Sequence, residues 1–457
     1  MRNSNNKMRI GGAILLALSM FSANAKVSQS EANRLGVDLT PLGGEMAGNK
    51  AGTIPAWNGG ITSVPAGYKA GDHHPNPFPD DKIQFTITPQ NLDKYKDALT
   101  PGQLALFETY PTTYKINVYQ TRRTSSYPQY VYDETKKNAV RSELIADGNG
   151  MKNAAIGTPF PIPQNALEVL WNHIVRYRGV NVKRSGGQAA PTRDGTFTFV
   201  QFEDELMNLY DDQKSTPESL EKSNLLFLFK QSVSSPARLA GTALLVHETL
   251  DQVKEPRQAW TYNTGQRRVR RAPNVAYDAP GTASDGLRTT DDFDMFNGAP
   301  NRYNWTLKGK KEIYIPYNSY ELHSDKHDYN EIIQPGHINP DLVRWELHRV
   351  WIIEGNLNPG TRHVYKKRVF YIDEDSWQIA EADVYNNNDQ LWRVEQAHIL
   401  NYYEVPVQWS TLETYYDLLS GRYIAIGLDN KESMYEFNAG LSEADFTPSA
   451  LRRSGIR

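Results

Sequence analysis

The sequence predicts a mainly β protein with some α-helices, built on a large curved antiparallel sheet. The chain of 457 residues contains 26 Tyr and nine Trp, which are residue types enriched in strands. From residue 224 onward, short segments of strand character alternate with turns of hairpin length, as expected for antiparallel neighbours. The alternation of strands and helices typical of a parallel βαβ sheet is missing, so a Rossmann or TIM-barrel architecture is not expected.

The first 25 residues have the pattern of an export signal. Arg2, Lys7 and Arg9 form a basic start, residues 10–21 are an apolar run, and a small-x-small cleavage motif ends at Ala25. This apolar run is too short for a permanent membrane-spanning helix, which disfavours the alternative of an uncleaved anchor. We therefore expect a signal peptide cleaved near Ala25 and a periplasmic protein that is not an integral membrane protein once processed.

Composition excludes several kinds of chemistry. The chain has no cysteine, which excludes disulfides, thiolate chemistry and the lipidated cysteine of a lipoprotein. Removing the predicted signal leaves 47 basic and 53 acidic residues, a net charge of −6. This balance argues against nucleic acid as a partner.

The N-terminal portion, residues 26–220, is predicted to be α+β. It begins with an irregular Gly- and Pro-rich segment, residues 35–61, in which Trp57 is the expected anchor to the body. Helices and strands are expected behind it from hydrophobic periodicity and proline positions. The expected helices are residues 128–144 and 164–177, and the expected strands are residues 114–122 and 196–202.

The C-terminal portion, residues 221–457, is predicted to hold the sheet, and the two portions can form one continuous domain. Alternating residues and turn-forming residues place its strands. The expected strands are residues 225–232, 238–248, 259–262, 267–271, 303–315, 344–355, 363–372, 377–385, 391–405 and 412–419.

Several of these strands mix aromatic and polar side chains on both faces. In residues 344–354, one face carries Trp345, Arg349 and Trp351. A strand packed in an ordinary sandwich alternates more cleanly. The mixture favours a curved sheet around a cavity, slightly ahead of a large sheet with helices on one side and water on the other.

Long motifs carry a family resemblance that covers nearly all of the mature chain. The sequence resembles domain-of-unknown-function family 1329, a family of exported proteobacterial proteins described as outer-membrane lipoprotein-sorting-like. The motifs are GTIPAWNGG, TPFPIP followed by LWNHIVRYRG, QRRVRRAP, DDFDMFNGAPNRYNW, GKKEIYIPYNSY, RWELHRVWIIE and RVFYIDEDSWQIAEADVY.

The resemblance implies a fold of LolA/LolB type: a strongly curved antiparallel sheet, or incomplete barrel, closed by helices over an apolar cavity. It also implies a periplasmic location and the handling of a lipid or other hydrophobic molecule. Members are often encoded beside efflux-type transporters and outer-membrane proteins, which implies an inner-membrane transporter and an outer-membrane protein as partners. No biochemical activity is established for the family.

Residues 260–271, WTYNTGQRRVRR, are predicted to form a hairpin. A four-residue loop would place Tyr262 opposite Arg267 and Trp260 opposite Val269. Two interpretations of the arginines remain open. Arg268 and Arg270 could recognise an anionic head group, because guanidinium groups match carboxylate and phosphate.

The second interpretation, which we favour, is internal pairing. Buried arginines need partners, and four aspartates follow the hairpin closely. In this interpretation the hairpin arginines pair with Asp285, Asp291, Asp292 and Asp294.

A set of histidines is the only metal candidate that the sequence suggests. His323, His327 and His337 lie among acids in residues 321–337, together with Asp325 and Asp328. Their spacing is loose against known ligand motifs, so we favour a solvated loop and predict no metal site.

Catalytic motifs are also missing from the sequence. It has no nucleophile elbow, zinc-protease motif, P-loop or dinucleotide fingerprint. Carboxylate pairs such as Glu381 with Asp383, or Glu346 with Glu354, have spacings that carry no information on their own. We therefore name no catalytic residue and no cofactor.

The predicted function is that of a periplasmic carrier or chaperone for a lipid or other hydrophobic molecule. The alternatives are an envelope hydrolase that acts on lipid or glycan, and a non-carrying adaptor between a transporter and the outer membrane. The aromatic residues expected to line the predicted sheet also include Trp377. The predicted ligand-binding residues are Trp260, Tyr262, Arg268, Arg270, Trp305, Trp345, Trp351, Phe370 and Trp392.

Overall fold

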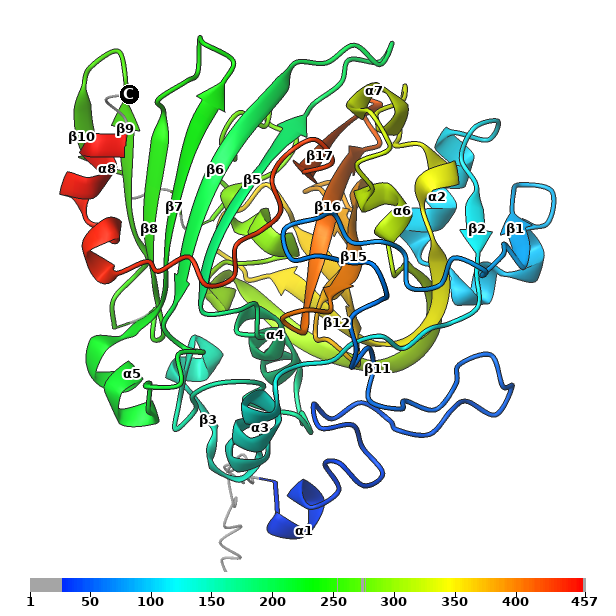
Figure 1. Cartoon of the computed structure of the whole chain (residues 1–457), viewed down its shortest axis with the longest axis horizontal. Helices are drawn as coiled ribbons and strands as arrows, with labels where there is room; N and C mark the ends of the chain where they lie inside the picture. Colours follow the sequence, from blue (N-terminus) through cyan, green and yellow to red (C-terminus); the bar gives the residue numbers. More distant parts are fainter. Residues whose placement is uncertain (1–26, 253, 273–274, 276, 455–457) are drawn as a thin grey trace, which may run out of the picture.

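One continuous sheet dominates the computed structural model, which describes residues 27–252, 254–272, 275 and 277–454 (Figure 1). The predicted signal peptide, residues 1–25, lies outside the described residues. Fourteen strands follow one another across the sheet, and β11 (Tyr303–Pro316) is added beside β12. The order is β1 (Phe85–Ile87), β2 (Ile116–Val118), β12 (Trp345–Leu357), β13 (Lys367–Asp373), β14 (Ile379–Tyr385), β15 (Leu391–Tyr402), β16 (Val407–Asp417), β17 (Arg422–Leu428), β5 (Asn181–Ala189), β6 (Phe199–Asn208), β7 (Leu225–Ser235), β8 (Ala243–Thr249), β9 (Gln258–Asn263) and β10 (Arg268–Arg271).

The sheet is antiparallel apart from a single parallel bridge between β2 and β12. Strands β5 to β10 form a wall that curves away from β12 to β16 (Figure 1). The strands at its two ends do not pair with each other, so the half-barrel stays open. The predicted fold class is therefore confirmed: mainly β, with a large curved antiparallel sheet and a few helices.

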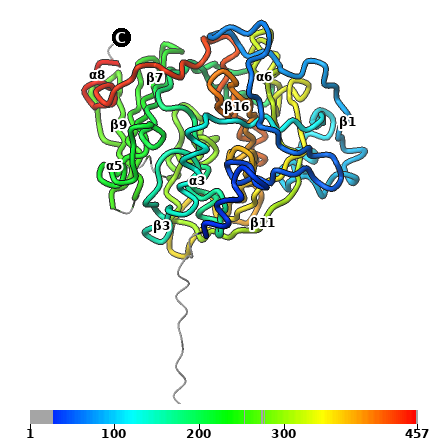
Figure 2. Tube along the Cα trace, turned by 60° about the horizontal axis from the view of Figure 1, so that its bottom comes forward, coloured from blue at the N-terminus to red at the C-terminus, as the bar shows by residue number. Residues whose placement is uncertain are grey.

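Helices and short 3-10 turns cover the sheet at several places. A separate hairpin of β3 (Glu143–Ile145) and β4 (Gly150–Lys152) lies near α3 (Figures 1 and 2). The helices are α1 (Gln29–Ala32), α2 (Pro101–Thr109), α3 (Gln129–Arg141), α4 (Ala166–Ile174), α5 (Pro217–Ser223), α6 (Tyr320–His323), α7 (Tyr329–Ile332) and α8 (Pro448–Ser454). The 3-10 turns used below are η4 (Thr290–Met295) and η7 (Glu443–Phe446).

Five strands were not predicted: the short β1, β3 and β4, and the longer β5 and β17. β5 contains the polar run Arg184–Ser185–Gly186–Gly187, and internal glycines weaken a strand pattern. Gly187 is required by packing, because a Cβ there would lie 2.2 Å from the Phe199 ring. β5 pairs with β17 on one side and with β6 on the other, so the sheet runs across residue 220 without a break.

The two faces of the β5–β10 wall pack against different elements. On β7, Phe227 and Phe229 belong to the large core that also contains α4. Leu228, between them, faces the opposite side, where Leu451 of α8 is buried. In Figure 1, α8 lies outside the wall and α4 lies on the side toward β12. We call these two sides the outer face and the concave face.

The Gly-rich N-terminal segment is ordered and held by buried arginines. Arg123 donates to the backbone oxygens of Glu45 (2.8 Å), Met46 and Pro55 (both 3.3 Å), while it forms an ion pair with Asp375 (2.6 Å). The predicted anchor Trp57 donates from its indole to the backbone oxygen of Ser125 (3.1 Å).

Glycine is required at points of close approach in this segment. At Gly43, with φ +101°, a Cβ would lie 1.8 Å from the Pro161 carbonyl oxygen. This crowding, together with the positive φ, accounts for the glycine in physical terms.

No helix among the described residues is long and apolar enough to cross a membrane.

Candidate functional site: the concave face of the sheet

The segment around η4 fills part of the concave face. Three aspartates fix it, because each one reaches buried cations or hydroxyl groups of the sheet and of the α4 end. Buried charges of this kind require such partners. The anchoring contacts are Asp291 with His363 (3.0 Å) and Arg368 (2.8 Å), Asp292 with the Tyr365 hydroxyl (2.8 Å), and Asp294 with Arg176 and Arg178.

Phe293 stands between these anchored aspartates. Its backbone (φ −58°, ψ 130°) interrupts the 3-10 turn, and Asp294 follows in the left-handed region (φ 55°). The ring of Phe293 lies 5.1 Å from that of Phe229 on β7. It is half-buried although most of its neighbours in the segment are buried. The segment therefore presents one aromatic ring to the hollow of the half-barrel.

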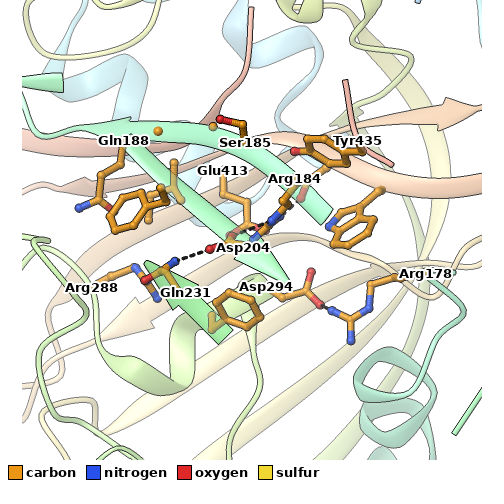
Figure 3. Close-up of a pocket in the computed structure, with 18 residues that line it drawn as sticks. Arg178, Arg184, Ser185, Gln188, Asp204, Gln231, Arg288, Asp294, Glu413 and Tyr435 are labelled. Carbon is orange, nitrogen blue, oxygen red and sulfur yellow. Dashed lines mark hydrogen bonds and ion pairs between the residues drawn. The ribbon is translucent and has the colours of Figure 1, made fainter. Parts of the chain in front are cut away.

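Charged and aromatic side chains line the hollow on one side of Phe293, which we call the polar pocket (Figure 3). Arg184 donates to Asp204 at 2.8 Å, and the Gln231 amide donates to the other oxygen of Asp204 at 3.0 Å. Arg184 also lies over Trp409, 5.4 Å from the ring centre. Figure 3 shows Arg178 beside Asp294 at one end of this pocket and Arg288 at the other.

Burial shifts the pKa values of charged groups in the polar pocket. It raises the pKa of Glu413, and the charge of Asp294 adds to this effect. Hydroxyl groups of Tyr415 (2.7 Å) and Ser410 (3.0 Å) donate to the Glu413 carboxyl and act in the opposite direction. Burial likewise lowers the pKa of Arg178 to about 10, although Asp294 beside it opposes the shift.

Apolar side chains line the hollow on the other side of Phe293, which we call the apolar pocket. Its walls are Phe227 and Phe229 of β7, Leu244 and Val246 of β8, and Val275. Gln231, Arg288 and Phe293 border both pockets. The hollow therefore offers an amphipathic surface in which polar and apolar parts adjoin.

Each pocket encloses only about 50 Å³. That is room for a few water molecules, whereas pockets that hold small molecules typically measure about 300–1,000 Å³. Phe293 borders both pockets and also a third, smaller one lined by Val182 and Leu206. Phe293 therefore lies where the three spaces adjoin.

The structure corrects the predicted geometry of the arginine hairpin. Tyr262 pairs with Val269 and Trp260 pairs with Arg271, whereas we expected Tyr262 opposite Arg267 and Trp260 opposite Val269. The difference arises because the turn includes Arg267, which adopts φ 51°.

The predicted internal pairing of the hairpin arginines is also wrong. Asp291, Asp292 and Asp294 bind the cations of the concave face, as described above, and Asp285 pairs with Arg422 (3.0 Å). Arg268 and Arg270 are exposed on the edge strand β10. Nearness in sequence misled the prediction, because the cations that these acids bind come from distant segments.

Trp260 and Tyr262, two predicted ligand-binding residues, face the other side of the sheet from the pockets. They belong to the cluster in which Phe446 and Leu451 of the C-terminal segment are buried. Arg271 lies over the Trp260 ring, 5.7 Å from its centre. These two aromatic residues therefore hold α8 on the outer face.

The other predicted aromatic residues are dispersed and do not share a cavity. Trp345 belongs to a separate core on the α2 side, and Phe370 is fully buried in the main core. Trp351 stacks on Trp377 at 6.3 Å. Trp392 donates to Asp417 (2.9 Å).

Trp305 alone of these residues lines a hollow among the pockets described. It stacks on Phe370 (5.7 Å) and borders an open hollow of about 490 Å³ beside residues 144–148 and 165–167. This hollow lies apart from the polar and apolar pockets.

The three histidines of residues 321–337 occupy three different environments. His323 is buried and contacts His74 (3.3 Å). His337, also buried, contacts Thr113 (2.9 Å). His327 contacts Glu321 (2.7 Å). The expectation of a solvated loop is wrong for His323 and His337, since both pack into the body beside α6 and α7.

A different group of side chains, all buried, brings possible metal ligands together. Ligand atoms of His348, Asp373 and Asp375 lie within 4.8 Å of one another. Both oxygens of Asp375 already accept hydrogen bonds from Arg123 (2.6 and 2.8 Å). This ion pair satisfies Asp375 without a metal.

Glu381 and Asp383 serve the N-terminus of α2. The Glu381 carboxyl accepts hydrogen bonds from Gln103 (2.6 Å) and Thr100 (3.1 Å), and Asp383 accepts one from the Gly102 backbone (2.9 Å). Burial raises the pKa of Asp383 to about 7. These contacts describe a buried helix cap, a structural arrangement in which both carboxyls are occupied.

Sequence reasoning missed the residues that line the polar pocket, above all Arg178, Arg288, Phe293 and Trp409. A signal for part of the site was present. The RYRG motif offers two arginines on one side of a short segment, and the DDFD motif offers acids that flank a single aromatic residue. Complementary charge between these two motifs would have pointed to their contact.

The known proteins that this chain resembles are mostly described without a function. A family model described as "Protein of unknown function (DUF1329)" matches residues 86–452. The uncharacterized protein PA3922 of Pseudomonas aeruginosa is 55% identical over 450 residues, which cover 98% of each chain.

Solved structures resemble the chain more distantly. A putative outer membrane lipoprotein-sorting protein domain from Vibrio parahaemolyticus has a TM-score of 0.44 and 13% identity, covering 63% of this chain and 98% of that one. A DUF1329 family protein from Desulfovibrio piger has a TM-score of 0.41 and 16% identity, covering 60% and 92%. The LolA superfamily protein NE2245 from Nitrosomonas europaea has a TM-score of 0.37 and 12% identity, covering 62% and 98%.

Proposed function

The chain belongs to the DUF1329 family, as its motifs predicted, and on that premise we propose that it is a periplasmic carrier for a hydrophobic or lipidic molecule. The molecule would bind on the concave face, where the polar and apolar pockets meet. The observation that carries the proposal is the half-buried Phe293, which borders the polar pocket and also the apolar pocket lined by Phe227, Phe229, Leu244 and Val246.

The energetics favour binding by burial. Each buried methylene contributes about 0.8 kcal/mol, so a chain of a dozen methylenes offsets the cost of association without directional chemistry. The present pockets are too small for such a chain. We therefore infer that the Phe293 ring turns aside and the pocket widens when a ligand enters.

The proposal extends to location and partners. The export signal predicted for residues 1–25 supports a periplasmic site of action. The LolA/LolB-type fold that the family resemblance implies supports delivery between membranes, with an inner-membrane transporter and an outer-membrane protein as partners.

A hydrolase receives less support from the site. Among the described residues, no histidine lines either pocket, and the carboxylates of the polar pocket are engaged. Asp204 accepts from Arg184 and Gln231, and Glu413 accepts from two hydroxyl groups. An acid–base pair needs a group that is free to reach the substrate.

Titration with the neutral apolar probe N-phenyl-1-naphthylamine tests the carrier. We expect the probe to bind saturably. Phe293→Ala should tighten binding, because it removes the ring at the border of the two pockets, and Phe293→Trp should weaken binding, because the larger ring fills the pockets. Phe85→Ala is the matched control, because Phe85 is a half-buried phenylalanine that packs in the separate core on the α2 side.

Organic extraction and mass spectrometry of protein purified from its native envelope provide the second arm. A co-purifying lipid or other apolar molecule is expected. Failure of both the wild-type protein and Phe293→Ala to bind the probe, with nothing co-purified, would refute the carrier.

A further inference from the structure

Arg288 is an exception among the buried arginines. Arg288 is 8% exposed. Its guanidinium donates one hydrogen bond, from Nη1 to the Thr289 backbone oxygen (3.5 Å), and its Nε has no partner. All other buried arginines of the described chain have a carboxylate within 4 Å. They are Arg123, Arg176, Arg178, Arg344, Arg349, Arg368 and Arg393.

Neither Asp204 nor Glu413 in the hollow forms an ion pair with Arg288, although the charge of Arg288 is among the causes that lower the pKa of Glu413. Asp204 is engaged by Arg184 and Gln231, and Glu413 accepts from two hydroxyl groups. Burial is the largest cause acting on Glu413, and it raises the pKa of that carboxyl. An uncompensated buried guanidinium is strongly unfavourable, so a place for an anion beside Arg288 is chemically reasonable.

The position of Arg288 adds a second, independent indication. It borders both the polar and the apolar pocket, and in Figure 3 it lies at the end of the polar pocket away from Arg178. Phe227, Phe229, Leu244 and Val246 line the apolar pocket beside it. A cation at the border of an apolar space matches a molecule that has one charged end and one apolar end.

We propose that Arg288 binds the anionic head group, a carboxylate or a phosphate, of an amphiphile whose apolar tail lies along the phenylalanines of β7. Guanidinium suits both head groups, because its planar set of donors matches two oxygens of either one. The inference rests on the proposed carrier function and narrows its ligand to anionic amphiphiles.

Competition between head groups tests the inference. Dodecanoate, dodecyl phosphate and neutral dodecanol, each below its micelle concentration, displace N-phenyl-1-naphthylamine from the full-length mature protein. We expect the wild-type protein to bind at least one anion about tenfold or more tightly than the alcohol, as for hydrogen bonds to charged groups. The tighter anion identifies a carboxylate or a phosphate as the head group.

Arg288→Gln is expected to remove that preference and leave the affinity for dodecanol unchanged. Arg288→Lys, which keeps the charge, should restore part of the preference for the anion. Arg268→Gln is the matched control, since Arg268 is exposed on β10. In the absence of ligand, Arg288→Gln should not lower the midpoint of thermal unfolding, because it removes a charge that has no ion pair.

The outcomes separate the two proposals. Equal affinity for the three compounds in the wild-type protein, or a preference that survives Arg288→Gln, overturns the role of Arg288 and leaves the carrier intact. A lowered unfolding midpoint together with an unchanged preference shows that Arg288 is structural, and this also overturns the inference. Failure of every compound and of the probe to bind refutes the carrier itself.

Discussion

Replacement of Arg123 by methionine should detach the N-terminal segment from the body. The Arg123 side chain is 2% exposed and pairs with Asp375, which is equally buried. It also donates to three backbone oxygens of residues 45–55. Removing one partner of a buried ion pair typically costs about 3–5 kcal/mol, because the other charge stays buried alone. We therefore expect the free energy of unfolding to fall by about 4 kcal/mol.

Urea unfolding followed by tryptophan fluorescence measures this loss, and limited proteolysis locates it. New cleavage should appear within residues 44–56, because their backbone loses its donors. Arg34→Met is the matched control: the pair of Arg34 with Asp38 is 48% and 56% exposed, and solvent screens such a surface pair, so its loss should hardly change the stability.

A double variant sharpens the test. Arg123→Met combined with Asp375→Leu removes both charges, and it should recover part of the lost stability. A loss below about 1 kcal/mol for Arg123→Met alone, with an unchanged proteolytic pattern, would contradict the proposed clamp.

Three further predictions concern stability. Burial raises the pKa of Asp383 to about 7 in the native state, so the native state retains a proton that the unfolded state releases above about pH 4. This carboxyl should therefore lower the stability by up to about 4 kcal/mol as pH rises from 4 to 7. Asp383→Asn should remove its share of the slope in unfolding measured across pH. His398 is buried with both ring nitrogens unpartnered, and burial lowers its pKa to about 3. The stability should therefore fall as pH falls from about 6.5 to 3, because the unfolded chain binds a proton on this ring that the native state does not. His398→Leu should abolish that fall, and it should stabilise the protein at pH 7 by about 1–3 kcal/mol in urea titrations, because it removes two unpartnered buried nitrogens. Gly43→Ala should destabilise far more than Gly52→Ala, because a Cβ at Gly43 meets the Pro161 carbonyl while one at Gly52 meets nothing within 4 Å. The Gly52 variant measures the cost of a positive φ alone, about 1–2 kcal/mol.

Each of these predictions has a contrary outcome. A pH profile of the Asp383→Asn variant parallel to that of the wild-type protein would assign the slope to other groups. Likewise, a stability profile of His398→Leu that runs parallel to the wild-type profile below pH 6.5 would assign the loss at low pH to other groups. If Gly43→Ala and Gly52→Ala lowered the free energy of unfolding equally, the backbone at Gly43 would be able to move away from Pro161 at little cost.

Local patterns predicted most strands because apolar alternation and turn residues lie within each strand. β7, for example, begins at the expected Leu225, and β14 ends at the expected Tyr385. β5 was missed because its glycines and polar residues do not give a strand pattern. At Gly187 the glycine is required by a contact with another strand, the packing of Phe199 over it.

The candidate site depended on contacts that sequence proximity does not reveal. Asp294 binds Arg176 and Arg178, more than a hundred positions earlier in the chain. The hairpin arginines lie nearer to Asp294 in the sequence, but they are not its ion-pair partners in the structure. Aromatic content identified the core, but it could not distinguish Phe293, which borders the pockets, from Trp345, which is packed in a separate core.

The union of β5 with β17 has a consequence for how the chain folds. Gln188 aligns with Ile426, so this seam joins the first and the last long strands of the sheet. A chain that emerges from its N-terminus keeps one edge of β5 without its partner until almost all of the sequence is available. Long-range pairing of this kind slows folding, and unpaired strand edges invite association between chains. We expect newly made protein to need protection from aggregation until β17 arrives and completes the sheet.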